Sequence, residues 1–411
     1  MDSSVFEDAR SFASEVTTPR LRASAAIGHQ QPDRVPVDFL ATPQVWDRLI
    51  RHLDLDPGST PTSGFTEAAR ERVLGALGID CRVVSYDMFC QPPESILGDA
   101  TVDWWGSLSR STPNRMWRRR NRDDTLNDIW GAHYRTVVTE QGGYDELASF
   151  PLGMATSTAE LAHHQWPEPD WWEWSGLVPL LRAWDEKQES HVRYRIGSVF
   201  EQAWHLRGMQ QFLLDLVLQP TIPTYIIQRI ADVHLENTRR VLELAGDRID
   251  CVYFYDDVAT KQTLMVSKKM WRDFIRPHHA KLAAVAHKYG KPVMYHCDGA
   301  VRPLIPELIE LGVDILSPIE PGASGMEPSI LKSDFGESLA FHGAIDIVKT
   351  LPKGTRDEVR AEVRGRVQTL GAGGGYILCS SHHIQPDTPV ENILEMYDVR
   401  WRRCQERADP A

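Results

Sequence analysis

The sequence predicts an α/β fold of the (β/α)8 TIM-barrel class, because short apolar segments alternate with helical patterns along the chain. Eight segments are rich in Val, Ile and Tyr and are mostly too apolar for a sheet with one exposed face. They are residues 34–39, 81–87, 192–201, 249–257, 291–298, 313–321, 339–346 and 375–383. Eight strands that alternate with helices form a closed parallel barrel.

The segments between these strands carry recognisable helix signals. In residues 355–371, Thr355 and Glu358 have the spacing of a capping box, and valines then recur at helical intervals. Thr388 and Glu391 repeat the same spacing and predict a second capping box. The two longest amphipathic patterns cover residues 224–245 and 270–289.

We expect a single domain over residues 1–411, with an N-terminal extension and an aromatic-rich insertion at about residues 100–175. Many of the 13 tryptophans fall in this insertion, in "DWWG", "DIWG" and "DWWEW". Packing is the simpler interpretation, and an aromatic mouth for a flat ligand is the alternative. A doubly wound open sheet is disfavoured because "GAGGGY" precedes a strand and no glycine-rich phosphate loop opens a helix.

Charge and composition exclude several classes of function. The net charge of −12 argues against a nucleic acid or an anionic membrane as partner, because both reward a basic face. No run of about 18 apolar residues is present, and the polar start "MDSSVFEDAR" has no signal-peptide core. The six cysteines include no CxxC pair. We therefore expect a cytoplasmic protein.

Acids and histidines stand at or just beyond the ends of nearly all the predicted strands. These residues are Asp87, Glu201, Asp256, Asp257, His296, Asp298, Glu320, His342, Asp346, His382 and His383. In a barrel these ends meet at one mouth, and unpaired buried charge is costly, so the density indicates a metal or acid–base site. Asp256 and Asp257 are adjacent and point oppositely, so only one need face the mouth. His278 and His279 lie away from strand ends, and we expect them to be surface or helix residues.

The segment "YHCDGA" predicts part of a metal site. His296 and Asp298 alternate along an extended chain, so their side chains point the same way while Cys297 points away. A third ligand must come from another strand, and His382 or His383 can supply it. Two histidines and one carboxylate suit Zn²⁺, or Mn²⁺ or Fe²⁺. A hydrogen-bonded structural His–Asp pair is the alternative interpretation.

An ordered set of longer motifs covers most of the chain. It comprises "HQQPDRVPVDF", "GIDCRVV", "GSVFEQAWHLRGMQQFLLDL", "YFYDDVATKQTLMVS", "WRDFIRPHHAKL", "YHCDGAVRPLIPELIELGVDILSPIEP", "LAFHGAIDIVKTLPKGT" and "GGGYILCSSHHIQPDTPVENILEMYD". In these motifs the sequence resembles the uroporphyrinogen decarboxylase superfamily, which includes zinc-dependent methyltransferases that act with corrinoid proteins. The resemblance implies a (β/α)8 barrel, in agreement with the strand pattern.

The resemblance also implies a metal site. The methyltransferase branch binds zinc through an H-x-C-G motif and a second cysteine. Here His296 keeps the first position, Asp298 replaces the motif cysteine, and His382 falls on the second cysteine position. The implied ligands of a divalent metal, Zn²⁺ first, are these three residues. Without thiolates the ion is more Lewis acidic, which suits polarising a carboxylate, phenol or water better than activating a thiol.

True uroporphyrinogen decarboxylases use no metal and carry an arginine-rich "RQAGRY" motif near the N-terminus. Nothing similar stands near residues 20–40. Asp87 corresponds to their early aspartate, and "SHHI" places His382 at their "GHGI" histidine. Without the arginine motif, decarboxylation of uroporphyrinogen itself is not expected.

The implied activity is a metal-dependent methyltransferase or demethylase that acts on a small methylated compound, with a corrinoid protein as partner and a homodimer as the assembly. The expected catalytic residues are Glu201, Asp257, His342 and His383, and the expected substrate-binding residues are Asp87, Glu320 and Asp346. A metal-assisted decarboxylase or lyase of a small carboxylic acid is the main alternative. A barrel that binds a ligand without turnover is the third.

Overall fold

The computed structural model of the protein describes residues 17–56, 67–97, 101–104, 117–121, 123, 125–139 and 142–402. The first 16 residues of the expected N-terminal extension, residues 105–116 of the expected insertion and Cys404 lie outside this range.

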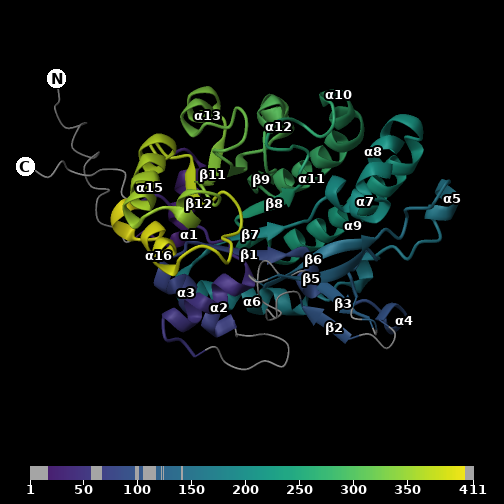
Figure 1. The fold of residues 1–411 in the computed structure, drawn as a ribbon, viewed down its shortest axis with the longest axis horizontal. Coiled ribbons are helices and arrows are strands. Elements are labelled where there is room, and N and C mark those ends of the chain that lie inside the picture. Colours follow the sequence, from purple (N-terminus) through teal and green to yellow (C-terminus); the bar gives the residue numbers. More distant parts are fainter. Residues whose placement is uncertain are drawn as a thin grey trace, which may run out of the picture.

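A seven-stranded parallel sheet forms the centre of the fold (Figure 1). Its strands are, in order across the sheet, β1 (Cys81–Ser85), β7 (His191–Arg195), β8 (Cys251–Tyr255), β9 (Val293–His296), β10 (Ile315–Ile319), β11 (Ala340–Ile345) and β12 (Tyr376–Ser380). Every neighbouring pair is parallel. These strands coincide with seven of the eight predicted segments.

The remaining predicted segment, residues 34–39, forms one isolated bridge, between Val37 and Leu378, instead of a regular strand. The Asp38 amide donates to the Leu378 carbonyl of β12 at 3.0 Å, and the Asp80 amide donates to the Val37 carbonyl at 3.0 Å. Pro36 cannot donate, which keeps the ladder short. The segment thus lies between β12 and β1, where the last strand of a barrel would lie. The sheet is a parallel half-barrel, consistent with a uroporphyrinogen-decarboxylase-like TIM barrel.

The helices of the described residues surround this sheet, except the short α4 and α5, which lie at the edge of the molecule (Figure 1). They are α1 (Pro19–Ile27), α2 (Pro43–His52), α3 (Glu67–Leu77), α4 (Glu94–Leu97), α5 (Thr158–Leu161), α6 (Leu177–Gln188), α7 (Phe200–Arg207), α8 (Met209–Leu218), α9 (Thr221–Ala245), α10 (Lys268–Met270), α11 (Arg276–Lys288), α12 (Ile305–Leu311), α13 (Pro328–Phe335), α14 (Thr350–Lys353), α15 (Arg356–Leu370) and α16 (Val390–Met396). Within the described residues, every helix is too short or too polar to span a bilayer.

The two capping-box predictions have different outcomes. At the start of α15, Thr355 and Glu358 cap each other's backbone amides, as predicted. The second prediction is wrong, because α16 begins after Pro389 with no side-chain cap. Thr388 is instead fully buried, and its carbonyl accepts a bond from Arg48 at 2.9 Å. Tertiary packing therefore overrides the local spacing at this position.

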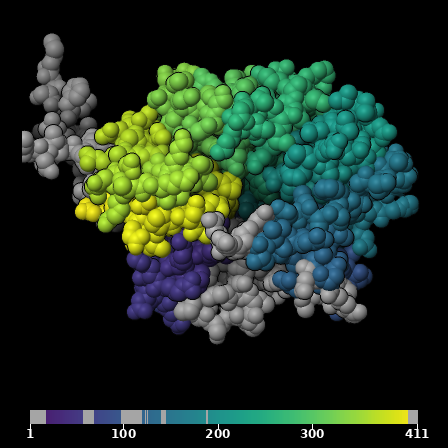
Figure 2. Space-filling model, viewed as in Figure 1, coloured from purple at the N-terminus to yellow at the C-terminus, as the bar shows by residue number. Residues whose placement is uncertain are grey.

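A five-stranded antiparallel sheet lies between β1 and β7 in the sequence. Its strands are β2 (Thr101–Trp104), β3 (Trp117–Arg120), β4 (Leu126–Asn127), β5 (His133–Thr139) and β6 (Gly142–Ser149). In Figure 2 this layer (blue) lies across the centre of the molecule from the yellow C-terminal residues. Trp130 and Trp172 of this region are buried, and both indole nitrogens donate to Tyr86 beside β1. Packing is thus the role of these two tryptophans.

Side chains from alternate positions fill the interior of the parallel sheet in layers. One layer is apolar and consists of Cys251, Met294, Ile315 and Ala340. The next layer, nearer the C-terminal ends of the strands, contains the ion pair between Asp38 and Arg193. The chemistry-bearing side chains lie beyond both layers, at the C-terminal ends of the strands.

Candidate metal centre

His296 and Asp298 face the same space at the end of β9. The Nε2 atom of His296 lies 3.7 Å from Oδ1 of Asp298. Cys297, between them, is fully buried in the core on the opposite side. The alternation predicted from the sequence therefore holds. The following turn depends on Gly299, whose φ is +84° and where a Cβ atom would lie 2.4 Å from the Thr260 carbonyl oxygen.

His382 completes a group of three side chains. It follows β12, and its Nε2 atom lies 3.3 Å from Oδ2 of Asp298. One potential ligand atom from each of His296, Asp298 and His382 lies within 4.8 Å of the others. Among the candidates for the third ligand, the structure places His382 in the group. His383 lies beside it, with ring centres 4.8 Å apart.

The donor atoms of this group suit a divalent cation. Nδ1 of His296 and Oδ1 of Asp298 are buried without a hydrogen-bond partner. Burial, opposed by Asp257, lowers the pKa of His296 to about 4, so the imidazole is neutral at pH 7. Burial, opposed by His382 and reinforced by Glu320, raises the pKa of Asp298 to about 6. A neutral imidazole and a poorly neutralised carboxylate are what a cation binds, so these residues fit a metal.

Asp256 and Asp257 diverge as expected for neighbours at a strand end. Oδ1 of Asp257 accepts the backbone amide of Asp298 at 2.8 Å and so fixes the turn that carries this ligand. Asp256 is fully buried and accepts the amides of Phe200 and Glu201 at 2.8 and 2.9 Å, at the start of α7. It also bonds Nε2 of His279 at 2.6 Å. Asp257 therefore faces the mouth.

His279 lies on a helix, as expected, but its structural role was not predicted. It is fully buried on α11 and connects that helix to Asp256 at the end of β8. Only the three-dimensional proximity of α11 and β8 identifies this pair.

Glu201 stands in the first turn of α7, facing the acids of the mouth. Burial, reinforced by Asp257 and Asp256, raises the pKa of its carboxyl well above the usual range. His205, one turn later on the helix, lies 3.7 Å from it. Burial also raises the pKa of Asp257, and the nearby His296 opposes this rise. A carboxyl group that keeps its proton near neutral pH can serve as a general acid.

The comparisons with known proteins concern the family and the fold of the chain. Residues 190–402, just over half of the 411-residue chain, match the family Uroporphyrinogen decarboxylase (URO-D). The chain belongs to the uroporphyrinogen decarboxylase family. Asp87, in the short helical turn after β1, lies before the matched range, whereas the three potential ligands all lie within it.

Solved structures show how far the likeness in fold extends. A methyltransferase from Methanosarcina mazei superposes with a TM-score of 0.60 at 17% identity, over 94% of this chain and 98% of that chain. A likeness at this identity shows a shared fold. An endo-1,4-beta-xylanase from Penicillium canescens reaches a TM-score of only 0.27 at 9% identity, over 50% of this chain and 78% of that chain. This score is too low to indicate a shared fold. A comparison with curated proteins gives no match.

The expected substrate-binding residues of this uroporphyrinogen decarboxylase family member occupy different places. Glu320 lines a cavity of about 350 Å³ together with Asp298 and His382. Its carboxylate accepts Lys261 at 2.8 Å and the Gly299 amide at 3.1 Å. Asp346 instead accepts the amides that follow it and stabilises a turn.

The third expected substrate-binding residue, Asp87, lies on the other side of the mouth. It is buried in the short helical turn after β1, and the Ser85 hydroxyl donates to it. Ser85 in turn accepts from Arg195 of β7 at 2.8 Å. Arg195, Tyr253 and Tyr255 line this side, and the sequence analysis missed them. The two-residue period of β7 and β8 could have identified these three residues, because it turns their side chains inward.

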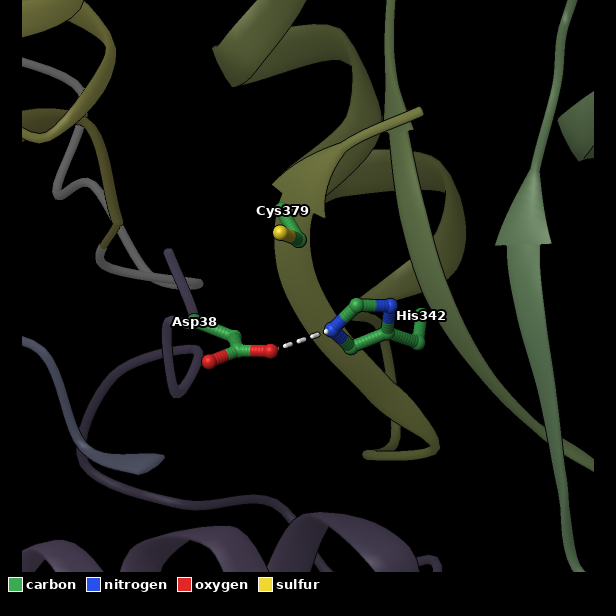
Figure 3. Close-up of side chains that lie close together, drawn as sticks. All are labelled: Asp38, His342 and Cys379. Atoms are coloured by element: carbon green, nitrogen blue, oxygen red, sulfur yellow. Dashed lines mark hydrogen bonds and ion pairs between the residues drawn. The ribbon is translucent and has the colours of Figure 1, made fainter. Parts of the chain in front are cut away.

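His342 lies one layer below the mouth, away from the three potential ligands. Its Nε2 bonds Asp38 at 2.9 Å (Figure 3). Its Nδ1 bonds the Ser317 hydroxyl at 3.0 Å. Both ring nitrogens are therefore occupied, and the structure leaves none for substrate. The expected acid–base role of His342 is not supported by this position; its bonds hold the layer beneath the site.

Asp38, His342 and Cys379 form a second group with the spacing of metal ligands. Three features disfavour a metal there. Arg193 already neutralises Asp38, and together with His342 it lowers the pKa of that carboxyl despite burial. His342 has no vacant nitrogen, and burial raises the pKa of the Cys379 thiol, which opposes the thiolate that a metal needs. We interpret this group as a structural network.

Proposed function

We propose that this protein is a metal-dependent methyltransferase that demethylates a small methylated compound, with a corrinoid on a partner protein as the methyl acceptor. The observation that carries the proposal is the convergence of His296, Asp298 and His382, with unpartnered buried donor atoms, at the mouth of a uroporphyrinogen-decarboxylase-type sheet. Two imidazoles and one carboxylate favour Zn²⁺ and leave coordination positions for a substrate atom. The fold shared with a methyltransferase supports the proposal.

The residues around the potential ligands have separate roles in the proposed reaction. The bound metal would supply a Lewis acid that polarises the heteroatom carrying the methyl group. Asp257 holds the backbone amide of Asp298 and so fixes the position of that carboxylate. Burial raises the pKa of Glu201 well above its usual range, which favours the protonated carboxyl, and in this proposal that carboxyl delivers its proton to the heteroatom as the methyl group leaves. His383, whose pKa is lowered by burial and by His382, remains neutral beside the ligands.

Metal analysis is the first test. We expect on the order of one transition-metal ion per chain in purified protein, and loss of it in His296→Ala. His287→Ala is the matched control, because His287 also lies 3.4 Å from an aspartate but is exposed on α11. Less than about a tenth of an equivalent in wild-type protein would be incompatible with a resident metal.

The reaction is tested by incubating the protein with methylated aromatic compounds and a methyl-accepting corrinoid protein. We expect the demethylated product and the methylated corrinoid in equal amounts. The alternative, a metal-assisted decarboxylase or lyase, is favoured by the same raised pKa of Glu201, because a carbanion left by CO₂ also needs a proton. Release of CO₂ from a carboxylic acid without methyl transfer would decide for that alternative.

A further inference from the structure

Arg195 is a cation in the mouth that the metal site does not use. Its Nε and Nη2 atoms both donate to the Ser85 hydroxyl, at 3.1 and 2.8 Å. Its guanidinium carbon lies 5.8 Å from the centre of the Tyr255 ring. Among the described residues, no carboxylate forms an ion pair with it. Its described contacts are thus with a neutral hydroxyl and an aromatic ring, and the carboxylate of Asp87 is linked to it through the Ser85 hydroxyl and by its electrostatic field.

The neighbouring arginine on the same strand shows the contrast. Arg193, two residues earlier and also directed inward, is ion-paired with Asp38. Other buried arginines are paired in the same way, Arg82 with Glu71 and Arg207 with Asp215. A buried guanidinium in this protein is thus regularly matched by a carboxylate of the chain, and Arg195 departs from this pattern where the sheet opens to the mouth.

Two aromatic rings lie between Arg195 and the potential metal ligands. Tyr253 and Tyr255 stand on β8, between β7 and β9, and the ring centre of His296 lies 6.1 Å from Tyr253 and 6.4 Å from Tyr255. The two tyrosines therefore connect the guanidinium to the first potential metal ligand. An aromatic ring packed against them would have one substituent near Arg195 and another near His296.

We propose that Arg195 binds the carboxylate of the substrate, and that the substrate is a small methylated aromatic carboxylic acid lying along Tyr253 and Tyr255. The planar guanidinium gives two parallel bonds to a carboxylate. The Ser85 hydroxyl accepts from the guanidinium and donates to Asp87, and these two bonds hold the guanidinium in place. The proposal deepens the function above and rests on it for the methylated end of the substrate. It assigns the carboxylate to the end away from the metal.

The test compares two probes that differ in charge. Isothermal titration calorimetry measures the Kd of 4-methoxybenzoate and of its uncharged counterpart 4-methoxybenzamide with full-length protein. A charge-assisted bidentate contact should favour the benzoate by about 10–100-fold. Arg195→Gln should abolish this preference, and Arg195→Lys should retain part of it, because lysine keeps the charge but lacks the fork.

Arg272→Gln is the matched control, since Arg272 is exposed and pairs with Glu307 away from the mouth. It should keep the wild-type preference. The comparison of the two probes on wild-type protein needs no variant. It therefore tests the charge preference even if Arg195→Gln does not fold. Equal or undetectable binding of both probes by wild-type protein, or a preference that survives in folded Arg195→Gln, overturns the proposal.

The same titrations on chelator-treated protein separate this proposal from the proposed function. A charge preference that persists without metal supports Arg195 as the anion site even if no methyl transfer is found. The opposite result would be methyl transfer from a neutral methylated compound together with equal binding of the benzoate and the benzamide. That result would support the proposed function and contradict the role of Arg195.

Discussion

Nε2 of His382 lies 3.3 Å from Oδ2 of Asp298, although the two residues follow strands β12 and β9. Two strands lie between these in the sheet. The contact exists because the loops after both strands fold over the same end of the sheet. Asp298 thereby stands between two imidazoles, and neither histidine alone would make a site.

Replacement of His382 should weaken metal binding without unfolding the protein. Its side chain is 39% exposed, so His382→Ala removes a ligand and little packing. Loss of an outer partner of a metal ligand typically costs about 10–100-fold in affinity, and loss of the ligand itself should cost at least as much. Competition with a chromophoric chelator measures this affinity. An unchanged affinity would exclude His382 from the ligand set, and His287→Ala provides the baseline.

Replacement of Asp38 should have the opposite effect, on stability and not on metal. Asp38→Asn leaves Arg193 buried without its counter-charge, which should lower the free energy of unfolding by about 3–5 kcal/mol. Urea denaturation measures the loss, and metal analysis of the folded variant should match wild type. If metal disappears in Asp38→Asn and in Cys379→Ser, the interior group is a metal site after all.

Several parts of the site could be predicted from the sequence because they depend on local geometry. The two-residue period of a strand places His296 and Asp298 together and turns Cys297 into the core. Apolar segments bounded by polar residues also located the parallel strands, since burial on both faces leaves a clear pattern. The choice of His382 came from the family resemblance, and it agrees with the structure.

Other parts depend on partners that are distant in sequence. Arg193 and Arg195 look alike in "VRYRIG", yet only Arg193 is ion-paired, because Asp38 reaches it from the segment beside β12. His342 similarly looked like a residue of the mouth, and its two bonded nitrogens place it in the layer below. Which inward position belongs to which layer is set by the stagger of neighbouring strands, and one strand's sequence does not contain it.

Gly197 should tolerate no side chain. Its φ is +123°, and a Cβ atom would lie 2.5 Å from Cε1 of His234. Backbone strain and overpacking together should make Gly197→Ala less stable by about 2–4 kcal/mol. Gly365→Ala is the matched control, because it lies within α15 with open space around it and should gain about 0.5–1 kcal/mol. Thermal unfolding of both variants tests the opposite signs.

The buried histidines should make the protein acid-sensitive. Burial lowers the pKa of both His191 and His234 to about 3. In the unfolded chain each would titrate near about 6.5, so between these values the unfolded state binds more protons and stability falls as pH falls. Per histidine the loss between pH 6 and 5 should be about 1 kcal/mol. Urea midpoints for wild type and His234→Gln should therefore converge on acidification, and parallel curves would contradict the prediction.

Asp256 should act on catalysis through the position of Glu201. Its carboxylate accepts the Glu201 amide and His279, so it connects the start of α7 to α11. Asp256→Asn keeps the shape of the side chain but turns a donor toward groups that also donate. We expect the first turn of α7 to loosen, because a buried contact between donors costs about 1–3 kcal/mol.

The resulting kinetic signature distinguishes a positioning residue from a ligand. In Asp256→Asn, kcat for demethylation should fall by about 10-fold or more, because a displaced general acid loses part of its roughly 100-fold or larger contribution. KM and metal content should stay near wild type, because the described bonds of the Asp256 side chain reach neither Arg195 nor the three potential ligands. The bond of Asp256 to His296 joins the two backbones, amide to carbonyl at 3.0 Å, and the substitution leaves it in place. Glu201→Gln should give a similar loss, and the double variant little more, because both changes disable the same proton transfer. Additive losses would show that Asp256 acts independently of Glu201.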